Sequence, residues 1–474
     1  MRPPNGASGI CRMAATELVR AIRDRQFSVR EVVSAFLDRI EDANPTVNAI
    51  ISMRPRETVL AEADAADSAL AAGATPGALF GLPVAVKDLA LTKGLTTTFG
   101  SPIFADFVPT EDDIFVERMR AAGAIVIGKT NVPEFGLGSH SYNPVFGVTR
   151  NALNPGLTAG GSSGGAAAAL ALDMLPIADG SDMGGSLRNP AGWNGVFGFR
   201  PSQGRVPSAS SPDLFMAQMG VEGPMGRNVA DMALLLDVMS GYDVRAPLSL
   251  AEGGDFLASL QRPLETARIG WLGDVGGHLA MEEGVLELCE AALARLQKAG
   301  YVIEEAALGF DAESVWQAFV TLRHATSGAA LKPLYDDPGK RPLLKPEAVW
   351  EIEGALGLTA PKIRQATEIR SAWYGAVLGL FRRYDFLALP TAQVFAFDAG
   401  LHWPDEIGGR TMDSYHRWME VTAYATMAGL PAAAVPVDRG RRDRSMGLQL
   451  IGPPRSDADT LRIAAAFERF AAAK

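Results

Sequence analysis

Apolar residues recur every three or four positions near the start of the chain, over the segments 14–24 and 28–42. This spacing gives a helix one apolar face, and Ser28 stands where the N-cap of the second helix is expected. We therefore expect two packing helices in this region.

Further along, short apolar runs end at Gly, Asp or Asn, a pattern typical of strands that lead into loops. The runs that follow this pattern or continue it later in the chain are 83–88, 123–131, 174–182, 267–273, 301–306 and 384–391. Amphipathic segments at 112–123 and 282–300 separate some of these runs, as crossover helices do between parallel strands. We predict one large α/β unit, a single α/β/α sandwich over residues 1–474 around a mixed, mostly parallel sheet.

Residues 311–380 differ from this alternation because their pattern is mainly helical. The segment carries Trp316, Phe319, Trp350 and Trp373, together with a basic, proline-containing stretch at 338–347. We interpret it as a helical insertion that covers the sheet.

Composition narrows the classes of function. The chain of 474 residues is 47% apolar and 21% charged, which is typical of a globular protein and excludes wholesale disorder. Its net charge of −10 disfavours nucleic acid as the main ligand. The longest uncharged run, 151–172, has Asn, Pro, Gly and Ser in its first half, so we expect a loop and a short helix there and no membrane span.

The cysteine content bears on the compartment. Cys11 and Cys289 lie far apart and form no CxxC pair, and no apolar stretch of signal-peptide length opens the chain. We therefore expect a cytoplasmic protein.

The densest Gly and Ser run, 158–165, precedes an alanine-rich segment that should be helical. Glycines and a helix N-terminus together could offer free N–H groups to an anion or oxyanion. The run lacks the lysine of a phosphate loop. It fits the GxSxG pattern of a nucleophile elbow with Ser163 at its centre, although the residues before it are a poor strand. A flexible turn is the remaining interpretation.

A second run, 180–188, follows the expected strand 175–178. Gly184 and Gly185 would let several N–H groups converge beside the Ser186 hydroxyl, as an oxyanion hole requires, so Ser186 is a candidate nucleophile. The alternative is a turn with a capping serine.

A serine nucleophile needs a base. The five histidines occupy no recognisable catalytic context. Lys87 ends an apolar strand, where burial would lower its pKa towards that of a usable base; its alternative is a surface charge at a strand end.

These elements together resemble the amidase signature family of serine amidohydrolases. The resemblance rests on GLPVAVKD at 81–88, GGSSGG at 160–165 and GSDMGGSLRNPAGWNGVFGFRPSQGRV at 180–206, and it extends over 123–135, 387–391, 429–436 and 446–454. Departures at Met183, at 199–202 and at Pro207 blur the subfamily and leave these three motifs intact.

The resemblance implies a catalytic set of Lys87, Ser162 and Ser186, with a cis peptide bond at Ser162. It also implies an oxyanion hole formed by the N–H groups of Met183, Gly184, Gly185 and Ser186. Ser162 would relay a proton between Lys87 and Ser186, and no metal or organic cofactor is required. Ser163, Asp182 and Arg188 are expected to support the site, with a solvated ion pair as the alternative for the last two.

We therefore expect a serine-dependent hydrolase that cleaves the C–N bond of a small linear or aryl amide, and also esters or carbamates, through an acyl-Ser186 intermediate. One alternative is a glutamine-dependent amidotransferase subunit that works with partner chains. Others are a Ser-His α/β-hydrolase that uses Ser163 and an inactive binding protein. Whether the chain forms a homodimer is left open. Pocket walls are expected from 134–150, 193–197, the helical insertion and 390–418, with the aromatic residues Trp193, Phe197, Trp316 and Phe319 favouring neutral, partly aromatic amides over glutamine.

Overall fold

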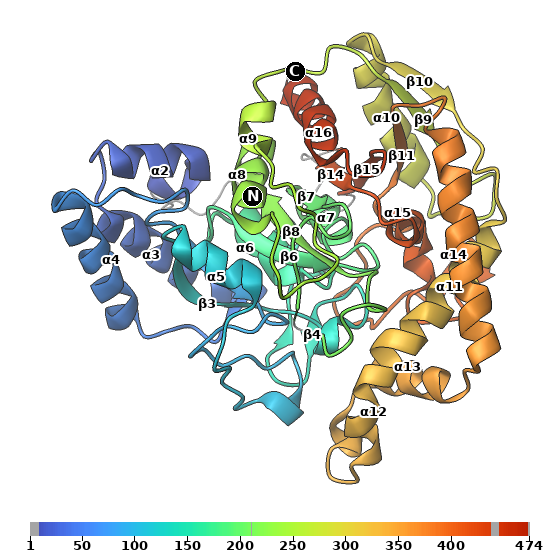
Figure 1. Ribbon diagram of the computed structural model, residues 1–474, viewed down its shortest axis with the longest axis horizontal. Coiled ribbons are helices and arrows are strands. Elements are labelled where there is room, and N and C mark those ends of the chain that lie inside the picture. Colours follow the sequence, from blue (N-terminus) through green and yellow to red (C-terminus); the bar gives the residue numbers. More distant parts are fainter. Residues whose placement is uncertain (1–8, 210, 438–444, 473–474) are drawn as a thin grey trace.

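The computed structural model describes residues 9–209, 211–437 and 445–472 (Figure 1). The expectation that no signal peptide opens the chain concerns, in part, residues 1–8. These residues lie outside the described part of the chain. No helix within these three ranges is long and apolar enough to cross a membrane.

Four helices open the fold: α1 (Gly9–Arg12), α2 (Ala15–Arg23), α3 (Val29–Val47) and α4 (Arg56–Ala71). The expected helices are α2 and α3. Ser28 caps α3, because its hydroxyl accepts from the Glu31 N–H while the Glu31 carboxylate accepts from the Ser28 N–H. This capping box explains why the helix begins where the sequence predicts.

A small sheet follows, with the strand order β1 (Ile50–Ile51), β3 (Ile125–Thr130), β2 (Pro83–Lys87). Strands β2 and β3 are parallel and are connected by α5 (Ile114–Ala121), which confirms the predicted strand–helix–strand unit. The carboxyl end of β2 is Lys87, so the fold delivers this side chain to the edge where the two parallel strands end.

The central sheet has eight strands in the order β10-β9-β11-β15-β14-β7-β8-β6. Their bounds are β6 (Ala178–Asp182), β7 (Phe197–Arg200), β8 (Val221–Gly226), β9 (Arg268–Trp271), β10 (Val302–Glu305), β11 (Phe386–Pro390), β14 (Ala432–Pro436) and β15 (Gly447–Ile451).

The sheet is mixed, as expected, but the prediction that it is mostly parallel is wrong. Among the described strands, β9 pairs in parallel with β10 and β11, whereas the other five pairs of the order are antiparallel. A parallel pair needs a crossover connection, and a helix crosses over between β9 and β10, whereas the described residues between β7 and β8 form no helix. The pattern of the first strand–helix–strand unit therefore does not extend to the later strands.

The strand expected at 175–178 is also displaced, because β6 begins at Ala178 and continues to Asp182. The polar and small residues of 179–182 pair with β8 along their whole length. A Cβ at Gly180 would lie 2.7 Å from the Ser163 hydroxyl and from Leu187, so glycine permits the close packing of this strand.

Two groups of helices cover the sheet (Figure 1). Helices α6 (Gly164–Ala171) and α7 (Asn189–Asn194) pack on each other, and α7 packs on β14 and β15. Helices α8 (Val229–Met239), α9 (Phe256–Ser259), α10 (Val285–Lys298) and α16 (Asp457–Ala472) form the second group, in which α16 also packs on β14. The result is the expected α/β/α arrangement.

The segment 311–380 is helical, as predicted. It contains α11 (Ala312–Arg323), a π-helix (His324–Gly328), α12 (Ala329–Asp336), a 3-10 turn (Arg341–Leu343), α13 (Pro346–Leu356) and α14 (Ala360–Leu380). Helices α11 and α14 lie side by side along one end of the molecule (Figure 1). That residues 1–474 form a single domain stays a prediction.

The remaining elements are short. They are the 3-10 turns Pro102–Phe104 and Glu134–Gly136, the hairpins β4 (Tyr142–Asn143) with β5 (Gly147–Val148) and β12 (Glu406–Ile407) with β13 (Arg410–Thr411), a 3-10 segment (Arg417–Thr422) and α15 (Ala423–Met427).

Candidate active site

Lys87 is buried, with 1% of its surface exposed, so the alternative of a surface charge at a strand end is wrong. Its Nζ atom donates to the hydroxyls of Ser162, Ser163 and Ser181, each at 2.8 Å. A weaker contact of 3.4 Å reaches the Ser181 carbonyl. One amine and three hydroxyls therefore form a compact polar cluster at the end of β2.

Two of these hydroxyls come from the Gly and Ser run before α6. The Gly161–Ser162 peptide bond is cis, as the family resemblance implies. A Cβ at Gly165 would lie 2.4 Å from the Asn131 N, so this glycine lets α6 start against the end of β3. The run is buried and ordered by these contacts, which excludes a flexible turn.

Ser163 is fully buried, and no strand precedes it. Its hydroxyl accepts from Lys87 and lies 3.4 Å from both the N and O atoms of Ser181. The residue is thus held beside Lys87, and it does not line the cavity that Ser162 faces. The geometry does not resemble a nucleophile elbow, which needs a strand before the serine and an exposed hydroxyl.

Burial and the surrounding carboxylates have opposite effects on the charge of Lys87. Burial lowers the pKa of Lys87 to about 8, against the opposing effect of the carboxylates of Glu222, Asp179 and Asp182. Asp179 accepts from the Lys87 backbone N–H, whereas, among the described residues, the amine itself contacts only hydroxyl and carbonyl oxygens. A buried amine without a carboxylate partner in direct contact loses its proton easily.

Glu222 is a member of the site that sequence reasoning missed. It lies on β8 opposite Ser181 of β6, and it lines the same cavity as Ser162 and Ser186. Burial raises the pKa of Glu222, and the Lys87 charge opposes that shift. The residue is distant in sequence from every motif, and only the antiparallel pairing of β6 with β8 reveals its position.

Ser186 follows β6 and lines a cavity of about 160 Å³ together with Ser162. Its side chain is almost buried, at 7% exposure, and Gly185 before it adopts a positive φ of 93°. Among the described residues, no hydrogen bond joins the hydroxyls of Ser162 and Ser186. The structure brings the two serines to one cavity without connecting them.

The backbone N–H groups beside Ser186 are not equivalent. The Gly185 N–H donates to Asp182 Oδ1 at 3.0 Å, so it is already engaged. For Met183, Gly184 and Ser186, the part of the chain that the structure describes shows no acceptor for the N–H group. Three of the four expected donors are thus available to a ligand in the cavity.

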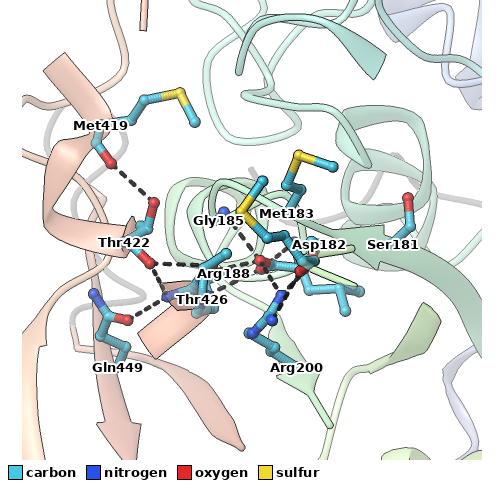
Figure 2. A network of polar contacts seen from close by, with 12 residues as sticks. Ser181, Asp182, Met183, Gly185, Arg188, Arg200, Met419, Thr422, Thr426 and Gln449 are labelled. Atoms are coloured by element: carbon cyan, nitrogen blue, oxygen red, sulfur yellow. Dashed lines mark hydrogen bonds and ion pairs between the residues drawn. The ribbon is translucent and has the colours of Figure 1, made fainter. Parts of the chain in front are cut away.

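Asp182 and Arg188 form a buried ion pair rather than a solvated one, and Arg200 joins them (Figure 2). All three side chains have an exposure of 0%. Arg188 also donates to the Thr422 carbonyl and to the Gln449 amide oxygen. Burial alone would raise the pKa of Asp182, but the two guanidinium groups hold it well below its usual range.

This network fixes the turn that carries Ser186. One carboxylate oxygen of Asp182 accepts from the Gly185 N–H, and the other accepts from the Leu187 N–H at 3.1 Å. The residues on both sides of Ser186 are therefore attached to the same buried carboxylate.

The cavity walls come from several predicted segments. Phe135, Gly136, Leu137 and Gly138 belong to the expected stretch 134–150, Arg323 and Ser327 to the helical insertion, and His416 to 390–418. Leu89, Met419 and the start of β8 at 220–222 also line the cavity, and the sequence does not predict these positions.

The expected contribution of 193–197 is wrong. Trp193 stacks on Trp418, with ring centroids 5.6 Å apart, and both Trp193 and Phe197 lie in the hydrophobic core. Trp316 and Phe319 are likewise core residues, on the buried face of α11, and do not line the cavity.

Arg323 reaches the cavity with its charge already paired. Its guanidinium forms an ion pair with Glu351 and donates to the Tyr415 hydroxyl at 3.0 Å. A third contact of 3.4 Å joins its Nη1 to the Met183 Sδ.

His416 lines the cavity, but burial lowers its pKa to about 3. No group of three potential metal-ligating side chains occurs among residues 9–209, 211–437 and 445–472.

Comparison with known proteins gives one consistent result. The family model described as Amidase matches residues 31–461. An acylamidase of Rhodococcus erythropolis is 33% identical over 461 residues, which cover 96% of this chain and 95% of that protein. A glutamyl-tRNA(Gln) amidotransferase subunit of Thiobacillus denitrificans is also 33% identical, over 95% of this chain and 96% of its own length. The crystal structure of a bacterial aryl acylamidase of the amidase signature family superposes with a TM-score of 0.91 at 29% identity, covering 97% of this chain and 96% of that one.

Proposed function

This chain belongs to the amidase signature family and is an amidase that hydrolyses carbon–nitrogen bonds; from that premise we propose that Ser186 attacks the carbonyl of a small linear or aryl amide. The observation that carries the proposal is the contact of a buried Lys87 amine with the Ser162 hydroxyl at 2.8 Å, in the cavity that Ser186 lines.

Neutral Lys87 acts as the base. Its Nζ takes the Ser162 proton while Ser162 takes the proton of Ser186, so that the Ser186 oxygen can attack. The Ser162–Ser186 hydrogen bond forms once substrate is bound, since catalytic hydrogen bonds are often loose in an empty site. Collapse of the tetrahedral intermediate breaks the C–N bond, and the proton returns through Ser162 to the departing amine.

The N–H groups of Met183, Gly184 and Ser186 receive the negative charge that develops on the carbonyl oxygen. Gly185 contributes differently, because its N–H binds Asp182 and thereby holds the turn in shape. Water then attacks the acyl-Ser186 ester along the same proton path and releases the carboxylic acid. Ser163 positions Lys87, while Asp182 and Arg188 position the turn.

The charges around the cavity favour a neutral substrate. Glutamine carries an α-carboxylate, which would need a cation without a partner. Arg323 is paired with Glu351, and Lys87 has to be neutral to act as a base. Glu222 on the wall offers no positive charge to a carboxylate either. These charges favour the acylamidase type of activity over the amidotransferase type, and esters or carbamates of similar size fit the same chemistry.

Two further properties of the enzyme are its compartment and its oligomeric state. We place the enzyme in the cytoplasm, since the chain has two cysteines that lie far apart in the sequence and form no CxxC pair. A homodimer is the assembly to test, by light scattering of the purified protein.

Covalent labelling tests the nucleophile. An aryl phosphonate that reacts with activated serines should modify the peptide that contains Ser186, as mapped by mass spectrometry, and Ser186→Ala should abolish the labelling. Ser162→Ala serves as the matched control, because its nucleophile is intact and should be labelled slowly. Labelling of Ser163 or Ser162 in the wild-type protein would overturn the assignment.

The substrate class is tested by rates. We expect a higher kcat/KM for an acyl anilide than for glutamine, and a clear preference for glutamine would favour the amidotransferase alternative.

A further inference from the structure

A second and larger cavity lies behind the wall of the active site. It has a volume of about 590 Å³, within the range of small-molecule binding sites. Met219 and Gln218 line it, whereas the next residues of the chain, 220–222, line the active-site cavity. The two cavities therefore share one wall of main chain.

Residues of the helical insertion also separate the two cavities. Leu322, Ala325 and Thr326 face the second cavity, whereas Arg323 and Ser327 face the active site. Ala325 and Thr326 belong to the π-helix, a form found most often at functional positions in helices.

Most of the second cavity is apolar. Its rim carries Phe215, Met216 and Tyr374, with exposures of 67%, 56% and 40%. Such side chains are costly to leave in water, and they would gain from contact with the apolar body of a ligand.

Among the described residues that line this cavity, Arg370 is the one charged side chain. Its Nε donates to the Met427 carbonyl at 2.9 Å, and its Nη2 contacts the oxygens of Gln203 and Gln218 at 3.3 and 3.5 Å. Within the described residues, its Nη1 has no hydrogen-bond partner and no carboxylate pairs with the guanidinium. Burial lowers the pKa of Arg370, and no neighbouring charge offsets this effect.

Leaving a half-buried guanidinium without a carboxylate partner is unfavourable in free energy. An anionic ligand that pairs with the guanidinium would therefore bind favourably. We propose that this cavity binds a small monocarboxylate with an apolar body, whose carboxylate pairs with Arg370 and whose body lies against Phe215, Met216 and Tyr374. The site is separate from Ser186 and does not depend on the reaction proposed above.

Calorimetric titration with 4-phenylbutyrate and with its uncharged counterpart 4-phenyl-1-butanol tests the proposal. The wild-type protein should bind the acid at least about tenfold more tightly than the alcohol, because a charge-assisted hydrogen bond is formed only with the acid. In Arg370→Met this preference should disappear. Arg364→Met, on the same helix but with a side chain that is 81% exposed, should keep it.

A second variant fills the cavity without touching the arginine. Ser371→Phe places a ring among the lining residues and should weaken binding of both probes, so it decides the matter if Arg370→Met does not fold. A purely structural role of Arg370, in holding α14 to Met427, would not produce the preference for the acid over the alcohol. Equal affinities for the two probes in the wild-type protein, an absence of acid binding, or acid binding unchanged in the folded variants would overturn the proposal.

Discussion

Ser181 and Asp182 are neighbours on β6, and they belong to two buried polar clusters with opposite properties. Side chains of consecutive strand residues point to opposite sides. Ser181 accordingly contacts Lys87. Asp182 faces Arg188 and Arg200 (Figure 2). In the first cluster a buried amine contacts only hydroxyl and carbonyl oxygens. In the second cluster every charge has a partner.

The difference shows that burial alone does not make a charged group reactive. Burial lowers the pKa of Lys87, and the nearby carboxylates offset this shift only in part, since among the described residues none of them contacts the amine. Asp182 is equally buried, yet its guanidinium partners keep it charged over the whole working range of pH. The first cluster is suited to moving protons, and the second is suited to holding a backbone in place.

The largest expected effect comes from removing the amine. Lys87→Ala deletes the base and leaves three serines without a proton acceptor, so kcat should fall by about 10⁴-fold or more. Initial rates with an acyl anilide measure the loss. Lys298→Ala, at the end of α10, is the control. Full activity of Lys87→Ala would show that Lys87 is not the base.

A substitution in the second cluster should lower the stability of the fold. Asp182→Asn leaves two buried guanidinium groups without their carboxylate, which should cost about 3 to 5 kcal/mol in the free energy of unfolding. Urea denaturation measures this change. Asp64→Asn breaks the exposed ion pair with Arg30 and should cost less than about 1 kcal/mol. A similar small loss for both variants would show that the Asp182 network does not hold the fold.

Two adjacent serines sharpen the comparison within the first cluster. Ser162 and Ser163 are equally close to Lys87, but only Ser162 lines the cavity. Ser162→Ala should reduce kcat by about 10² to 10⁴-fold, as expected for a lost general acid–base group, yet still form acyl-enzyme. Ser163→Ala should reduce kcat by only about tenfold, since it supports the amine. Single-turnover rates decide, and the reverse order would favour Ser163 as the reacting group.

The smallest effect concerns Glu222. Its carboxylate favours the charged form of Lys87, so Glu222→Gln should lower the pKa of Lys87 and shift the rising limb of the pH profile to lower pH by about half a unit to one unit. Glu57→Gln, at an exposed position on α4, should leave the profile unchanged. A shift towards higher pH would contradict the assigned electrostatics.

The part of the site that lies in local motifs could be predicted from the sequence. Lys87 ends a strand and the serines follow glycines, and these features are visible within short windows. The partners that act across the sheet could not be found in this way. Glu222 and Arg323 reach the cavity only through strand pairing and helix packing, and no short-range pattern encodes these contacts.

The fold shows the same division. The unit from β2 to β3 follows a local pattern of strand, helix and strand, and its prediction is confirmed. The direction of β14 and β15 depends on which neighbour each strand pairs with, so the predominance of antiparallel pairs could not be predicted from local pattern. Closeness to Ser186 in sequence suggests a place for Trp193 on the cavity wall, whereas α7 turns this side chain into the core.

The pH dependence of kcat/KM for a neutral acyl anilide tests the central claim most directly, because the anilide does not titrate between about pH 6 and pH 10. If Lys87 must be neutral in the free enzyme, kcat/KM should rise about tenfold per pH unit at low pH and level off above a pKa of about 8. A profile that is flat or that falls as the pH rises through this range would contradict the claim that an unpaired buried lysine is the base.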